Sequence, residues 1–307
     1  NSALYENLEL YLAKIFKSES TLVFNSGYQA NLALVSAVPQ KGDTIIYDQL
    51  SHVCLKEGAW LSKAESVMFA HNDLEDLERK LNHATGDKYV VLETVYSMDG
   101  DKAPLSKMID LCKSYQAKII IDEAHSTGVV GEGGNGLCCD LGREEDFFAR
   151  VYTFGKAMGV HGACIACSHQ LREYLINFAR PFIYTTALPL HSVISIEQSF
   201  HYLRRNTHVQ GALNELIGFY QTGIQQIADT KEGVYYPGSD TAIQPLIIPG
   251  NGRIRAISDK LGGRNLDVRP ILSPTVKKGS ERLRISLHIY NTIEEIELLL
   301  GALNEFL

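Results

Sequence analysis

Short apolar runs alternate with amphipathic segments through the first half of the chain. Three of these runs are rich in Ile and Val and lack a polar face: 44–47, 89–92 and 118–121. Such runs are typical of strands that are buried on both sides of a sheet. Residues 52–62, 73–82 and 105–115 instead space their apolar side chains as amphipathic helices do. Because strands joined through helices run parallel, the alternation predicts a mainly parallel central sheet with helices on both faces.

Helical spacing also begins the chain. Residues 2–16 repeat leucine and isoleucine on one helical face. A break follows Phe24, and a second helix is predicted to run to Ala37, with Asn25 or Ser26 as its N-cap.

The pattern changes near Pro189. Residues 189–227 predict long helix without a strand, and residues 293–306 predict a closing helix. Three strands are expected between these helices, at 243–248, 267–269 and 282–287. We therefore expect a large domain over residues 1–195 and a smaller C-terminal α/β domain over residues 196–307.

Composition excludes several classes of function. The 307 residues carry a net charge of −7 and no basic run, so nucleic acid and anionic membranes are poor candidates for partners. The apolar runs fall far short of the ~20 residues that span a bilayer. Six cysteines are too sparse for a disulfide framework and suit a reducing compartment, so a cytoplasmic location is expected. The chain begins at Asn1 rather than Met, so a targeting signal cannot be judged.

Three motifs resemble sites of other protein classes. Cys164 and Cys167 form a CxxC pair, which we interpret as part of a buried strand, and no metal site is predicted. Residues 122–125 spell the Asp-Glu-Ala-His box of helicases, but no phosphate-binding GxxxxGK[ST] loop precedes them. Residues 131–136 match GxGxxG, yet they follow a late strand and no clear helix, so a flexible loop beside an active site is expected.

Lys156 and Asp122 together point to a cofactor. Lys156 follows an apolar stretch and is flanked by glycines, and we expect it to be buried. A buried lysine is costly unless its amine is used, for example in a Schiff base with pyridoxal 5'-phosphate (PLP). PLP also needs an acid beside its pyridine nitrogen, and Asp122 follows a run of isoleucines.

Other residues meet the remaining demands of PLP. The helix start at 26–28 offers backbone N–H groups to the phosphate, and Thr153 offers a hydroxyl. His52 can lie flat against the ring. His125 and Ser97 can bond its phenolic oxygen.

Each of these residues also has an ordinary structural interpretation. His52 alone is more often a structural histidine, Ser97 suits a turn, and Asp122 suits a cap. Arg284 can bind a substrate carboxylate with two hydrogen bonds or form a weak surface ion pair. The hypothesis depends on all of them occurring in a workable order.

In this order the residues resemble the α-oxoamine synthase family. These PLP enzymes have the aspartate-aminotransferase fold, and they join an amino acid to an acyl thioester with loss of CO₂. The matching stretches are 24–31, 50–52, 69–73, 93–101, 122–128, 153–163, 184–189 and 268–284.

The resemblance implies a role for each residue around the cofactor ring. Lys156 would bond PLP covalently and later move the Cα proton. Asp122 would pair with the pyridine nitrogen, and His52 would stack on the ring. Ser97 and His125 would contact the phenolic oxygen.

It also implies how the phosphate is held. Gly27, Tyr28 and Thr153 would bind it within one chain. Thr185 or Thr186 would reach the phosphate of the neighbouring subunit, which implies a homodimer with shared active sites.

Within the family the loops at 122–128 and 159–162 resemble the biotin-pathway member most. That resemblance implies L-alanine and a pimeloyl thioester, on CoA or a carrier protein, as substrates, with Arg284 holding the amino-acid carboxylate. A glycine-using relative such as 2-amino-3-ketobutyrate CoA ligase is the alternative, followed by another PLP activity such as an aminotransferase and by a non-catalytic protein of the fold. The family usually carries an N-terminal arm before the stretch that begins here at Asn1, and that part is missing or not included in this sequence. The chain also departs from the family in carrying Cys54, where serine is common, and Leu190, where a second proline is common.

Overall fold

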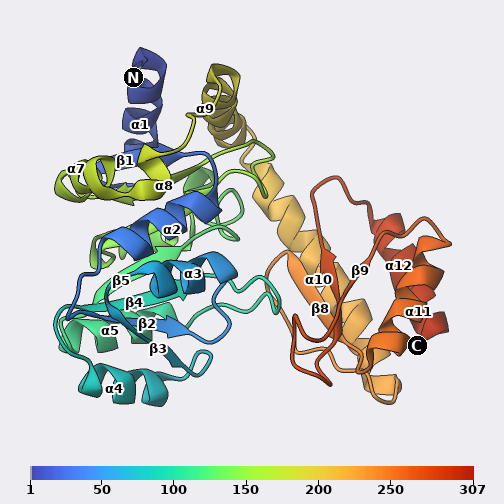
Figure 1. Cartoon of the computed structure of the whole chain (residues 1–307). Coiled ribbons are helices and arrows are strands. Elements are labelled where there is room, and N and C mark those ends of the chain that lie inside the picture. The colour runs from blue at the N-terminus through green and yellow to red at the C-terminus, as the bar shows by residue number, and fades with distance from the viewer. Residues whose placement is uncertain (1) are drawn as a thin grey trace. The chain divides into compact units, whose positions relative to one another are not determined.

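The computed structural model describes residues 2–307 and divides them into two compact units (Figure 1). The first unit runs to Tyr96 and resumes over Lys102–Asn206, and the second combines Ser97–Asp101 with Thr207–Leu307. We had expected the boundary at residue 195, and the units instead divide after Asn206.

The first unit is built around a seven-stranded sheet in the order β1-β7-β6-β5-β4-β2-β3. Its strands are β1 (Ser20–Phe24), β2 (Thr44–Asp48), β3 (Glu65–Phe69), β4 (Lys88–Glu93), β5 (Lys118–Asp122), β6 (Ala149–Thr153) and β7 (Ala163–Cys167). The pairs from β3 through β2, β4 and β5 to β6 are parallel, and β7 runs antiparallel to both of its neighbours, β6 and β1. The predicted mainly parallel central sheet is confirmed.

Helices cover both faces of this sheet. They are α1 (Ala3–Ile15), α2 (Gly27–Ala37), α3 (Val53–Leu61), α4 (Leu74–His83), α5 (Leu105–Ser114), α6 (Leu137–Asp140), α7 (His169–Phe178), α8 (Arg180–Ile183) and α9 (Leu190–Arg205). Leu34 of α2 and Leu55 of α3 pack on one face with Val91 and Ile120. The other face carries separate clusters from α4 with α5 and from α1 with α9. Strands with apolar side chains on both faces are therefore fully covered, as their sequence requires.

The two cysteines of the CxxC pair lie on β7, as expected, and point to opposite faces. Cys164 packs in the cluster of α1 and α9, whereas Cys167 packs in the cluster of α2 and α7. Side chains three residues apart on a strand diverge in this way, so the pair cannot hold one ion. Among residues 2–307 no group of three His, Cys, Asp or Glu side chains is arranged to bind a metal, and no helix in that range has the length and apolarity to cross a bilayer.

The second unit contains a three-stranded antiparallel sheet in the order β8-β10-β9. Its elements are α10 (His208–Thr230), β8 (Ile243–Ile247), α11 (Asn251–Gly262), β9 (Arg269–Ile271), β10 (Arg282–Ser286) and α12 (Ile293–Phe306). The long helix expected over 189–227 is two helices, α9 and α10. Phe200 on α9 packs with α1, which keeps α9 in the first unit and moves the boundary to Asn206. Helix α11 was not expected.

Candidate active site

The carboxyl ends of three parallel strands meet the start of α2 in the first unit. Asp48, Asp122 and Thr153 are the last residues of β2, β5 and β6. Ligands of open α/β sheets bind at this edge. A pocket of about 230 Å³ lies there, lined by Asn25, Ser26, Gly27, Tyr28, Asn31, His52, Cys54, Asp122, Ala124, Thr153, Gly155, Lys156, His161 and Gly162.

Lys156 sits in a tight turn between β6 and β7. The turn is closed by hydrogen bonds from the Val160 N–H to the Phe154 carbonyl, 2.9 Å, and from the Phe154 N–H to the Gly162 carbonyl, 2.9 Å. Its Nζ lies 2.8 Å from Nε2 of His125, so one of the two donates to the other. The expectation that Lys156 is buried is wrong, because the turn projects it from the sheet edge and leaves its side chain exposed in the single chain.

Asp122 is buried and held in place through both of its carboxylate oxygens. Oδ2 accepts a hydrogen bond from Nδ2 of Asn31 at 2.5 Å, and Oδ1 accepts one from the Ala124 N–H at 2.7 Å. Asn31 lies one turn inside α2 and is itself buried. Sequence reasoning missed it, although a buried amide on an otherwise apolar helix face was a visible signal.

The start of α2 forms a cradle beside β6. Ser26 is the N-cap, and its Oγ accepts from the Gln29 N–H at 3.3 Å, which settles the choice left open between Asn25 and Ser26. A Cβ built on Gly27 would lie 2.2 Å from Cγ2 of Thr153, so only glycine fits. Oγ1 of Thr153 is buried and has no hydrogen-bond partner among residues 2–307. A helix start, a missing side chain and an unsatisfied hydroxyl fit a bound phosphate.

His52 caps the start of α3 and is fixed at two points. Its backbone N–H donates to Oε1 of Glu93 at 2.5 Å, and its Nδ1 accepts from the Cys54 N–H at 3.3 Å. Sγ of Cys54 also lies 2.9 Å from Nδ1. Burial lowers the pKa of His52, the Asp122 charge opposes that shift, and the Lys156 charge adds to it.

Glu93 is a second buried carboxyl that sequence reasoning did not single out. It ends β4 and stands in register with Asp122 on β5. Burial, followed by the charge of Asp122, raises the pKa of Glu93 to about 8. A generic acid at a strand end gave no signal of this, because the shift depends on a neighbour 29 positions away along the chain.

The glycine-rich loop that follows β5 is anchored by Glu123. The carboxylate of Glu123 accepts from the N–H groups of Leu137 at 3.0 Å and Cys138 at 2.8 Å. A Cβ on Gly136 would lie 2.9 Å from that carboxylate, so glycine is required for the close approach. A buried side chain therefore fixes the end of the GxGxxG segment, which we had expected to be flexible.

Thr185 and Thr186 contact the start of α2 in their own chain. Nδ2 of Asn25 donates to Oγ1 of Thr185 at 3.0 Å and to the Thr186 carbonyl at 2.5 Å. Tyr28 lines the pocket but turns its hydroxyl to a carboxylate oxygen of Glu57. Their predicted contacts with a phosphate stay predictions.

Ser97 and Arg284 belong to the second unit. Nε of Arg284 donates to the Ser97 carbonyl at 2.6 Å, and its Nη1 lies 3.2 Å from Oγ of Ser286. Burial lowers the pKa of Arg284. The predicted site residues thus fall into two groups, with Gly27, His52 and Lys156 among those in the first unit.

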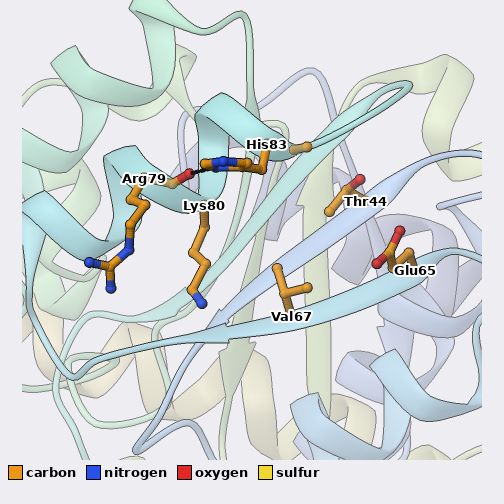
Figure 2. A pocket seen from close by; sticks show the side chains of 7 residues that line it. Thr44, Glu65, Val67, Arg79, Lys80 and His83 are labelled. Carbon is orange, nitrogen blue, oxygen red and sulfur yellow. Dashed lines mark hydrogen bonds between the residues drawn. The ribbon is translucent and has the colours of Figure 1, made fainter.

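A larger pocket, of about 330 Å³, lies elsewhere in the first unit (Figure 2). Its lining residues are Thr44, Glu65, Val67, Arg79, Lys80, His83 and Ala84. Thr44 and Glu65 begin β2 and β3, so this pocket lies at the amino ends of the strands. In Figure 2 the His83 ring turns to the Arg79 carbonyl, and their hydrogen bond measures 2.7 Å. We take the smaller pocket as the candidate active site because it lies at the carboxyl ends of the strands and contains Lys156 and Asp122.

Comparison with known proteins settles the family. A model of class I and II aminotransferases matches residues 2–303. The chain belongs to this family. Its relatives include the 8-amino-7-oxononanoate synthases of Emericella nidulans, 36% identical over 100% of this chain and 78% of that protein, and of Pseudomonas entomophila, 38% identical over 99% and 77%.

Solved structures agree. Serine palmitoyltransferase of Sphingomonas wittichii is 32% identical with a TM-score of 0.93, over 100% of this chain and 76% of that one. A serine palmitoyltransferase solved with PLP is 29% identical with a TM-score of 0.93, over 100% and 77%. The 8-amino-7-oxononanoate synthase of Francisella tularensis is 27% identical with a TM-score of 0.87, over 99% and 87%.

These findings confirm three predictions from the sequence. The resemblance to the α-oxoamine synthases holds along the whole chain. PLP is the cofactor, in agreement with the family and with the PLP-bound structure. The chain is a PLP-dependent C-acyltransferase similar to 8-amino-7-oxononanoate synthase.

Proposed function

We propose that this enzyme condenses L-alanine with a pimeloyl thioester, releasing CO₂ and the free thiol carrier and forming 8-amino-7-oxononanoate for biotin synthesis. The main support for this proposal comes from the relatives, because 8-amino-7-oxononanoate synthases match this chain over nearly its whole length at 36–38% identity. The pocket supports it with a lysine, a buried aspartate and a phosphate cradle at one sheet edge.

The residues of the pocket divide the chemistry between them. PLP, when bound, supplies an electron sink for charge that develops at the amino-acid Cα. Asp122, oriented by Asn31 and the Ala124 N–H, would hold the proton on the pyridine nitrogen. Gly27 and Thr153 would bind the phosphate beside the positive end of α2.

Lys156 is proposed to take the Cα proton and later to return it. Its 2.8 Å contact with Nε2 of His125 gives the ammonium an acceptor, so the pair can pass a proton between Nζ and Nε2. Arg284 is proposed to bind the amino-acid carboxylate through its guanidinium, and Ser97 to bond the phenolic oxygen.

The decisive experiment is a substrate titration of the PLP-loaded protein. L-alanine is expected to change the visible absorbance of bound PLP at concentrations below those needed for glycine or L-serine, and pimeloyl-CoA is then expected to release free thiol. Lys156→Ala should lower thiol release at least about a hundredfold, since proton transfer contributes on that scale. Lys80→Ala, in the pocket of Figure 2, is the control and should keep full activity.

Two results would contradict the proposal. A response to glycine alone would assign the enzyme to the glycine-using relatives. Thiol release by Lys156→Ala at the unmodified rate would remove that residue from the mechanism.

L-serine is included because one observation favours it. The serine palmitoyltransferases reach TM-scores of 0.93, against 0.87 for the 8-amino-7-oxononanoate synthase structure. A response to L-serine with a long-chain acyl-CoA, and none to L-alanine, would support that second candidate.

We also propose that the enzyme works as a homodimer in a reducing cytoplasm. Exposed apolar side chains of the first unit include Leu50 and Val53, which lie within two residues of His52, and Ile183 and Tyr184, which precede Thr185. Covering them with a second copy would remove apolar surface beside the pocket from water. Sedimentation equilibrium should give twice the mass of the chain, and a stable monomer would contradict the proposal.

A further inference from the structure

A line of hydrogen-bonding side chains in the wall of the pocket connects Asp122 to His52. Nδ2 of Asn31 lies 2.5 Å from Oδ2 of Asp122 and 3.5 Å from Sγ of Cys54. The same sulfur lies 2.9 Å from Nδ1 of His52. Asn31 and Cys54 are 1% and 2% exposed, so water does not compete for these contacts.

The carboxylate at one end of this line sets the direction of the hydrogen bonds from the Asn31 amide. A carboxylate oxygen accepts, so the Asn31 atom facing Asp122 must be the amide nitrogen, which fixes the orientation of the amide. Its second N–H then points to the Cys54 sulfur. A sulfur that accepts from Asn31 has its own S–H left to donate to Nδ1 of His52.

The backbone N–H of Cys54 donates to Nδ1 of His52, which makes Nδ1 an acceptor and the thiol the donor in their contact. The Cys54 N–H approaches Nδ1 at 3.3 Å, in addition to the thiol at 2.9 Å. A ring nitrogen that accepts hydrogen bonds carries no proton, so in the neutral ring Nε2 must carry it.

The surroundings favour the neutral ring and the intact thiol. Burial lowers the pKa of His52, and the charges of Lys156 and Lys56 add to that shift against the opposing charge of Asp122. Burial also raises the pKa of the Cys54 thiol well above its ordinary value, which keeps it a donor.

We propose that Cys54 and Asn31 are positioning residues that lock His52 as the neutral tautomer with its proton on Nε2. The proposal rests on the proposed role of His52 as the ring that stacks on PLP. A neutral imidazole can lie against a protonated pyridine ring, whereas an imidazolium would be repelled by it. Asn31 would thus orient Asp122, the partner of the pyridine nitrogen, and through Cys54 also His52, the stacking residue. One amide does both because it bonds to Asp122 and to Cys54.

The test reads the tautomer directly. Nitrogen-15 NMR of the full chain with labelled histidine, with and without PLP, distinguishes a pyridine-type from a pyrrole-type nitrogen, and His52→Gln identifies the signal. We expect pyridine-type Nδ1 and pyrrole-type Nε2 in the unmodified protein, both with and without PLP.

Four variants then separate positioning from packing. Cys54→Ser keeps a donor and should keep the tautomer. Cys54→Ala and Asn31→Ala should populate the other tautomer or the charged ring and lower the turnover of the PLP-loaded enzyme about tenfold, or about 1.4 kcal/mol. Cys112→Ala removes an equally buried thiol from α5, so it should leave the His52 signals unchanged.

Three outcomes would overturn the proposal. These are an unmodified protein with its proton on Nδ1, a Cys54→Ala protein with the unmodified His52 signals and turnover, and a Cys54→Ser protein that behaves like Cys54→Ala. The first is measured on the unmodified protein once the signal is assigned, so a misfolded variant of Cys54 or Asn31 cannot hide it. If the tautomer is as expected but L-alanine and a pimeloyl thioester do not react, the proposed substrates fail and the positioning role stands.

Discussion

A methyl group at position 27 would clash with Thr153 inside the pocket. The Cβ of an alanine there would lie 2.2 Å from Thr153 Cγ2, which is below any real contact distance. Both residues lie on rigid elements, α2 and β6, so neither can yield easily. Because position 27 is glycine, the start of α2 can lie close to the Thr153 hydroxyl, which has no hydrogen-bond partner among residues 2–307.

Gly27→Ala should therefore weaken PLP binding at least tenfold, or about 1.4 kcal/mol or more. Titration of the PLP-free protein followed by absorbance measures the dissociation constant. Gly218→Ala on α10 is the matched control, because its Cβ would meet nothing within 4 Å. Unchanged affinity in Gly27→Ala would show that the cradle does not hold the phosphate.

At the scale of single residues, the sequence reveals reactive residues that stand in unusual local contexts. A lysine between glycines and an acid after three isoleucines stand out wherever they occur, and Lys156 and Asp122 do line one pocket. Asn31 was missed although it is an amide on an otherwise apolar helix face, and Glu93 was missed because its partners come near only in the folded sheet. The exposure of Lys156 was also hidden, since it depends on how its turn leaves the sheet.

At the scale of elements, burial on both faces made the central strands predictable. β2, β4 and β5 coincide with apolar runs that lack a polar face, and such runs indicate strands buried on both sides. β3 was missed because it is the edge strand and most of its side chains are partly exposed. α11 was missed, and the glycines near both its ends are residues typical of loops.

Two serine caps allow a matched comparison. Ser26 accepts from the Gln29 N–H at the start of α2, and Ser168 accepts from the Leu171 N–H at the start of α7, at 3.3 and 3.2 Å. Ser26→Ala and Ser168→Ala should each cost about 1 kcal/mol of unfolding free energy, measured in urea. Only Ser26→Ala should also weaken PLP binding, because only α2 begins at the pocket. Equal PLP affinities would contradict the phosphate role of this helix start.

At the scale of the whole molecule, stability should depend on pH through Glu93. Its pKa is raised to about 8 in the folded chain, against an ordinary value of 4.5. The stabilisation from its bound proton is complete below pH 4.5 and is lost as the pH rises to about 8. Glu93→Gln keeps an acceptor for the His52 N–H and cannot ionise.

The unmodified protein should therefore lose stability relative to Glu93→Gln between pH 5 and 8, by up to about 1.4 kcal/mol per pH unit. Urea unfolding of the PLP-free protein at several pH values measures this difference. A difference that stays constant across the range would mean that Glu93 is already ionised in the folded chain.

The division into two units was predictable in kind but not in position. Helix-rich sequence after the large sheet indicated a second domain. Phe200 packs α9 against α1, however, so α9 belongs to the first unit, which extends to Asn206. Residues 97–101 joined the second unit without any local signal, because their contacts with Arg282 and Arg284 span more than 180 positions.

The sheet order also has a consequence for synthesis. β1 lies at one end of the sheet beside β7, and residues 25–162 separate the two strands in the chain. At roughly 5–20 residues per second, a ribosome needs on the order of ten seconds to deliver that segment. For that time the nascent β1, which is fully buried in the finished fold, has no strand to pair with. Its unpaired backbone groups and apolar side chains are then open to other nascent chains, so slow translation of the segment should favour aggregation over folding.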